Sequence, residues 1–364
     1  MKRLSILLIL LFFGVSLVFA DQSVLIDFTQ LEADDQVDGR PMHFATMVDF
    51  SGQAGASYTQ EEKDRMLISL ALPDWEIKLA SSSQTTENLR YSKTRAATSR
   101  TYGQVLGARI HFPTGSYNSF AIVEPPFEIP AYQRPTVYDP DDNELRDMTD
   151  EEIAAENDQR SQEAGRELQA GDPGYLEDNG KFDGFGVIKN VGDIKEIQVE
   201  VYGQNYPHGL SLRYKDQSGA VHDIFMDHLR FDGWKKIVWR NPNYIQSVRD
   251  RELYSLPLYP QAFPFMKFLG FIIHRDGANI RSDFIVYFKD IQVIYDKAVI
   301  TQDRDIDDEE IWGILEEREA ARRAAEIRRL GNVQVLRYLE KKKQALETES
   351  FDETEAEQGN GEGE

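Results

Sequence analysis

The stretch IKEIQVEVYG, residues 194–203, carries the clearest secondary-structure signal in the chain. In it, Ile197, Val199 and Val201 alternate with a glutamine and a glutamate. Successive side chains of a β-strand point to opposite faces of its sheet. This period of two therefore predicts a strand with one buried face and one face in water.

Similar runs of β-branched and aromatic residues, bounded by turn residues, occur on both sides of this stretch. Turn sequences such as Asp216–Gly219 separate them, and strands do not alternate with helices. Many short strands at this spacing favour a mainly β fold, an antiparallel β-sandwich of the jelly-roll type, over residues 21–300. The runs are 23–28, 66–72, 75–80, 105–112, 119–124, 209–215, 222–229, 234–239, 268–275 and 283–296.

The N-terminus has the pattern of a cleaved secretory signal over residues 1–20. Lys2 and Arg3 precede the apolar run Leu4–Val18, and cleavage is expected between Ala20 and Asp21. The run of about 15 apolar residues is short for a membrane span of roughly 20. The sequence thus predicts an exported protein without membrane insertion.

Composition restricts how this chain is stabilised and what it binds. It contains no cysteine, so hydrophobic burial rather than disulfides must hold an exported chain together. The formal net charge is −22, which repels nucleic acid and anionic lipid and excludes both as main partners.

An acidic, partly helical insertion is expected over residues 139–183. It contains 16 acidic and 4 basic residues, a local charge of −12. Thr149 and Glu152 form a capping box, which predicts a helix from about Asp150 to Gln169. Disorder of the flanks is an alternative.

A helical extension is expected over residues 301–346. Apolar residues recur there at helical spacing, Gly331 is a candidate C-cap, and Asn332 could begin a second helix. Residues 318–343 hold 9 basic and 3 acidic residues, whereas residues 347–364 hold eight acids and no base and predict a disordered tail. The basic helices either pack on their own domain or contact an acidic neighbouring subunit, for example its insertion.

A search for catalytic or metal-binding motifs predicts no enzyme, no metal and no cofactor. The sequence contains no H-E-x-x-H, G-x-S-x-G or Walker motif. His222 and His228 are too far apart along a strand to share a metal. Residues 303–308 begin like a calcium loop, but Asp308 replaces the glycine that the loop requires.

The segment WKKIVWRN, residues 234–241, supplies candidate contact residues. As a strand, it places Ile237 and Trp239 inward and Trp234, Lys236 and Arg240 outward. An outward aromatic side chain beside basic residues suits sugar stacking and protein contact equally. The alternative is a tryptophan at the rim of the sheet, covered by a neighbouring loop.

The proline-rich segment EPPFEIPAYQRP, residues 124–135, is the second candidate. Its prolines exclude a central strand and predict a stiff, extended segment. Phe127 and Tyr132 are either displayed for recognition or tucked under a loop that straps the sandwich.

Three motifs together resemble the flagellar filament outer layer protein (FlaA) family of spirochaetes. They are DWEIKLASSSQTTENLRYSKTR (74–95), GQVLGARIHFPTGSYNSFAIVEPPFEIPAY (103–132) and DGWKKIVWRNPNYI (232–245). The resemblance extends from about Ser23 to Ile294. It implies a periplasmic, non-catalytic sheath subunit that binds a core of flagellin-like subunits and neighbouring sheath proteins or copies of itself. Such a subunit contributes to the shape and stiffness of the filament and to motility.

The strand pattern of that family is similar to jelly-roll carbohydrate-binding modules. This leaves a second interpretation, a secreted or periplasmic carbohydrate-binding module. The two are compatible if the core carries glycans that the sheath binds.

Overall fold

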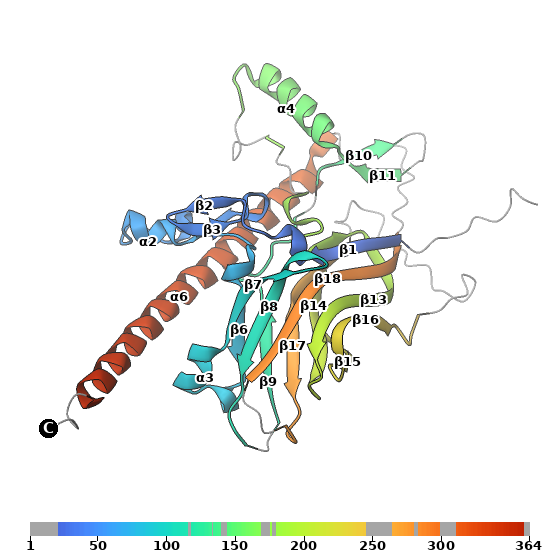
Figure 1. Ribbon diagram of the computed structural model, residues 1–364. Coiled ribbons are helices and arrows are strands. Elements are labelled where there is room, and N and C mark those ends of the chain that lie inside the picture. Colours follow the sequence, from blue (N-terminus) through green and yellow to red (C-terminus); the bar gives the residue numbers. More distant parts are fainter. Residues whose placement is uncertain are drawn as a thin grey trace, which may run out of the picture.

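A computed structural model describes residues 21–115, 118–132, 134–139, 144–168, 175–176, 180–244, 264–279, 283–298 and 311–359. Its body consists of two six-stranded antiparallel sheets (Figure 1). The first has the order β16 (Asp232–Arg240), β13 (Val191–Gln204), β18 (Asp283–Lys297), β8 (Gly103–His111), β7 (Lys93–Ser99), with β1 (Asp21–Asp27) paired to β18. The second has the order β15 (Val221–His228), β14 (Gly209–Asp216), β17 (Phe265–Arg275), β9 (Ser119–Glu124), β6 (Glu76–Leu79), with β12 (Val187–Lys189) paired to β17.

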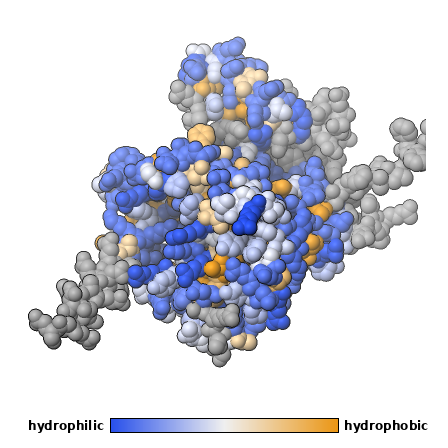
Figure 2. All heavy atoms as spheres, viewed as in Figure 1, coloured by the Kyte–Doolittle hydropathy of each residue, from blue (hydrophilic) through white to orange (hydrophobic). Residues whose placement is uncertain are grey.

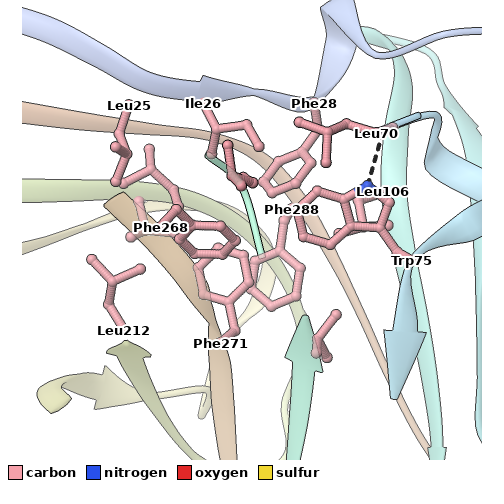
Figure 3. Packing of buried hydrophobic residues seen from close by; sticks show 14 of the residues in the cluster. Leu25, Ile26, Phe28, Leu70, Trp75, Leu106, Leu212, Phe268, Phe271 and Phe288 are labelled. Carbon is pink, nitrogen blue, oxygen red and sulfur yellow. Dashed lines mark hydrogen bonds between the residues drawn. The ribbon is translucent and has the colours of Figure 1, made fainter. Parts of the chain in front are cut away.

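These two sheets confirm the predicted antiparallel β-sandwich. Ile197, Val199 and Val201 of β13 are fully buried, as their alternation predicts. In the core, Phe271 of β17 stacks on Phe288 of β18, with ring centroids 3.9 Å apart. Trp75 packs beside them and donates its indole N–H to the Leu70 carbonyl at 3.0 Å (Figure 3). The aromatic core thus joins one sheet to the other.

Short elements surround the sandwich. The additional strand pairs are β2 (Asp35–Val37) with β3 (Arg40–Met42), β4 (Val48–Asp49) with β5 (Leu67–Ile68), and β10 (Thr136–Asp139) with β11 (Glu144–Asp147). The short helices are α2 (Gln60–Asp64), α3 (Thr86–Tyr91) and the 3-10 turns Phe28–Gln30, Phe44–Thr46, Ser51–Gln53, Leu72–Asp74, Ser81–Ser83 and Gly180–Phe182. The predicted strand at 66–72 is reduced to the two residues of β5.

The acidic region contains the hairpin β10–β11 and the helix α4 (Asp150–Ala164). Both hydrogen bonds of the predicted capping box form between Thr149 and Glu152. The helix ends at Gly165 in a left-handed conformation, φ +66°, earlier than the predicted Gln169. Residues 169–174 and 177–179 lie outside the described residues.

One long helix, α6 (Ile314–Gly359), replaces the two helices predicted for the C-terminal region. Gly331 does not end a helix; a Cβ atom there would lie 2.0 Å from the Gln53 side chain, so glycine permits close packing instead. The helix continues past Glu347, where the sequence predicts a disordered tail. Extending an existing helix costs far less than nucleating one, which favours this continuation.

His208, in the connection between β13 and β14, is buried at one end of the sandwich with 1% of its surface exposed. Its Nδ1 accepts a hydrogen bond from the Asp276 backbone N–H at 3.0 Å. The rings of His208 and Phe284 pack in a T-shaped arrangement, with their centroids 4.8 Å apart. Burial, helped by the Arg275 charge, lowers the pKa of His208 to about 4.

This lowered pKa predicts acid destabilisation. Above pH 6.5 His208 is neutral in both states, whereas below 6.5 only the unfolded chain binds the proton. Stability is therefore lost as the pH falls from 6.5 towards 4, by about 3 kcal/mol in total. His208→Asn keeps an acceptor for Asp276 and should reduce the pH dependence of the unfolding free energy by up to about 1.4 kcal/mol per pH unit. Urea unfolding between pH 4.5 and 7 tests this. Exposed His228→Asn is the control, and an unchanged slope in His208→Asn would contradict the assignment.

Candidate interaction surfaces

Strand β16 has the two faces that its sequence predicts. Ile237 is buried and Trp239 packs half-buried against the core. Trp234, Lys236 and Arg240 lie on the opposite, outer face. The three predicted contact residues thus share a face, although they do not form one cluster.

Trp234 belongs to an outer aromatic cluster with Tyr102, Tyr202 and Tyr287. Strand register aligns Trp234 with Tyr202 and Tyr202 with Tyr287 across β16, β13 and β18. The Trp234 ring lies edge-on to Tyr102 at 5.1 Å and to Tyr202 at 5.4 Å. Tyr102 comes from the turn between β7 and β8, so its ring contact places a loop residue beside the half-buried Trp234.

Charged groups surround the outer aromatic cluster. The Lys289 ammonium lies 5.2 Å from the Tyr102 ring centre, and Lys236 is exposed beside Gln292. Arg240 lies further along the strand, with 77% of its side chain exposed and an ion pair to Glu196 at 3.2 Å. Sequence reasoning identified neither Tyr202 nor Tyr287, although both occupy outward positions of alternating strands.

Phe127 and Tyr132 lie in different surroundings. Phe127 is only 2% exposed and packs edge-on against Phe50 and Phe182, so it is a core residue and not a displayed contact. Tyr132 is half-buried in a small cleft beside Arg322 and Glu326 of α6. The proline-rich segment is therefore a strap, held between the sandwich and α6.

Glu128 of this strap ties three elements together. Its carboxylate accepts from Lys267 of β17 at 2.8 Å, Lys215 of β14 at 2.9 Å and Arg329 of α6 at 3.3 Å. Burial alone raises the pKa of Glu128, but Lys267 and Lys215 outweigh it and lower that pKa to about 2. The strap thus carries an anion at all physiological pH values, and that anion anchors α6.

A second set of contacts fixes α6 further along. Arg337 bridges Glu76 and Glu124, which are register partners on β6 and β9, and also donates to the Pro126 carbonyl at 2.8 Å. Lys342 binds Glu62 of α2 at 2.8 Å. We call the contacts of Glu128, Arg337 and Lys342 the α6 seam. They show that the basic part of α6 packs on its own body, one of the two alternatives.

A groove of about 1080 Å³ lies between α6, β6 and α3. Arg40, Arg65 and Lys93 line it, and its apolar part includes Leu89 and Phe120, each 42% exposed. The face of the molecule shown in Figure 2 is otherwise largely hydrophilic, with hydrophobic residues in small separate groups.

Within the described residues, no group of three or more histidine, cysteine, aspartate or glutamate side chains is placed to hold a metal. Nor does any helix in that part of the chain have the length and hydrophobicity to cross a membrane. The predicted cleavage site at Ala20 and the calcium-like residues 303–308 lie outside the described residues, whereas Asp21 begins β1.

The fold and these surfaces define a β-sandwich protein with a long helical arm. The family described as "Flagellar filament outer layer protein Flaa" matches residues 41–304, and the chain belongs to this family. A flagellar filament outer layer protein of Spirochaeta aurantia is 46% identical, with 97% of this chain and 96% of that protein covered. Its counterpart in Treponema pallidum is 42% identical, with 90% of each covered.

A more distant relative and a solved structure complete the comparison. The outer layer protein of Borreliella burgdorferi is 28% identical, with 80% of this chain and 74% of that protein covered. Among solved structures, a family 11 carbohydrate-binding module of Clostridium thermocellum is 9% identical over 61% of this chain and 87% of the module, with a TM-score of 0.23. That similarity is too low to inform on ligands.

The α6 seam predicts a specific loss of stability. Arg337→Gln removes the guanidinium that bridges Glu76 and Glu124. Among the described residues, Glu76 then keeps only Lys341 and Glu124 only Lys78 as an ion-pair partner. Unfolding in urea should show a cost of about 2 kcal/mol. Arg328→Gln makes the same charge change at an exposed position of α6 and should cost less than about 0.5 kcal/mol. Equal effects of the two variants would refute a structural role for the seam.

Proposed function

We propose that this protein is a sheath subunit of a periplasmic flagellar filament, where it binds a core of flagellin-like subunits and neighbouring copies. Relatives named as flagellar filament outer layer proteins, similar over nearly the whole chain, carry the proposal. In this role the protein contributes to the shape and stiffness of the filament and so to motility. Catalysis plays no part in it.

Two structural features support such a role. A sandwich whose two sheets share one aromatic core is a rigid block that can be tiled. The α6 seam holds the helix α6 on this block, and the C-terminal end of α6 extends beyond it (Figure 1). This end can therefore contact a neighbouring subunit.

Fractionation of the producing bacterium tests the proposal. Filaments purified from the periplasm should contain this protein, and its N-terminal residue should be Asp21. The same preparation from cells that lack the core subunits is the control and should yield the protein in the soluble periplasmic fraction. Recovery only in the soluble fraction of intact cells would overturn the proposed function.

The outer aromatic cluster favours a second candidate function, glycan binding by the same sheet. Trp234 is half-buried, with Lys236, Glu200 and Gln292 on neighbouring positions of the face. An aromatic ring with polar groups beside it can bind a sugar by stacking and hydrogen bonding. This activity would let the sheath recognise glycans on the core.

Saccharide titration of the purified protein tests this candidate. Tryptophan fluorescence should change on addition of the cognate glycan, and Trp234→Ala should abolish the change. Trp312→Ala removes an exposed tryptophan outside the cluster and should leave it intact. A flat titration across a broad glycan panel would dismiss glycan binding.

A further inference from the structure

The charges of α6 are divided between its middle and its C-terminal end. At least four of its nine basic residues pair with carboxylates of the body, namely Arg329, Arg337, Lys341 and Lys342. The last three turns, residues 348–359, carry five acidic residues and no base. We call residues 348–359 the acidic arm. The acidic arm therefore carries the charge that a cationic surface of another copy would attract.

The groove between α6, β6 and α3 has the opposite character. Arg40 donates to three backbone carbonyl groups, Asp64, Arg65 and Leu67, and its charge also acts on the carboxylate of Asp74 in the same groove. Arg65 and Lys93 are exposed, and neither forms an ion pair with another described residue. The lining of the groove contains seven basic and three acidic residues, so in a chain with a net charge of −22 it is a local concentration of cations.

The groove also has apolar surface for a helix. Leu89 and Phe120 line it and are partly exposed. At the C-terminal end of α6, Leu346 is 60% exposed, and the sequence of the acidic arm adds Phe351. A helix that enters the groove can therefore bury apolar surface as well as pair charges.

The acidic arm cannot occupy the groove of its own chain. The α6 residues that line the groove run from Gln334 to Ala345, and the middle of the arm lies about eight residues beyond Ala345 on the same continuous helix, about 12 Å further along its axis. Figure 1 shows this end of α6 directed away from the body. The groove and the arm can only meet between two molecules.

We propose that the acidic arm of one copy docks in the cationic groove of the next copy. This deepens the proposed function and rests on it, since it names one contact between neighbouring sheath subunits. The two surfaces differ, so the contact is heterologous, and each molecule keeps one free arm and one free groove. Such contacts propagate into open chains unless a rotation closes them.

The acidic helix α4 of a neighbour is the competing occupant, and three of its six acidic residues already pair with arginines. Asp150 pairs with Arg134 at 2.6 Å, Glu152 with Arg146, and Glu156 with Arg160 at 2.9 Å. The acidic arm contains no basic residue at all. Charge complementarity therefore favours the arm.

Two charge-reversal variants test the proposal. One reverses the arm with Glu349→Lys, Asp352→Lys and Glu353→Lys. The other reverses the groove with Arg65→Glu and Lys93→Glu, both at exposed positions. Sedimentation velocity at low ionic strength measures the association of each variant alone, of their equimolar mixture and of the unmodified protein. Exposed Arg328→Glu, on α6 outside the groove, is the matched control.

The unmodified protein and Arg328→Glu should associate with rising concentration, and 0.5 M salt should dissociate them. Each reversed variant alone should associate about tenfold more weakly or not at all. The equimolar mixture should associate like the unmodified protein, because the reversed arm of one variant can then bind the reversed groove of the other.

An unmodified protein that stays monomeric, or a mixture that associates no better than its components, overturns the arm–groove contact. The proposal is also overturned if the groove-reversed variant does not associate while the arm-reversed variant associates normally, because a segment other than the arm then occupies the groove. Recovery of the reversed variants on purified filaments would separate failure of this contact from failure of the proposed function.

Discussion

Apolar packing between the two sheets holds this molecule together, because the chain has no cysteine with which to form disulfides. Strands β17 and β18 each lie in the middle of a sheet, and their Phe271 and Phe288 stack across the interface. A register shift in β17 turns both Phe268 and Phe271 towards the core. Gly270, φ +154°, permits that shift, since a Cβ there would lie 2.6 Å from the Val123 carbonyl oxygen.

The rigid sandwich makes the outer contacts specific. Glu76 and Glu124 face the same direction because β6 and β9 pair in a fixed register, and a single guanidinium can then bridge them. Glu128 is similarly fixed by the lysines of two neighbouring strands before it meets Arg329. A helix as long as α6 would gain little from isolated surface ion pairs. It gains more here because preorganised, partly buried carboxylates receive it.

The sequence predicted what depends on local periodicity and failed where tertiary contacts decide. The buried face of β13 and the inward Ile237 follow from alternation. Strand β7 was not predicted, because its sequence has no apolar alternation. It is an edge strand that forms through its pairing with β8. Gly331 has the sequence signature of a helix end, yet Gln53, distant in sequence, determines its role. The burial of Phe127 likewise results from contacts with Phe50 and Phe182, which are distant in sequence and cannot be inferred from local periodicity.

The distribution of charge over the fold determines where copies of this chain can contact one another. Copies of a chain with net charge −22 repel one another, so close tiling requires places where local cations meet local anions. The α6 seam consumes basic residues to neutralise the carboxylates of β6, β9 and the strap within one molecule. The same commitment carries the acidic end of α6 outward, beyond the cations that hold its middle. Intramolecular neutralisation and an outward acidic end are thus two results of one arrangement: a helix whose basic part meets an acidic body.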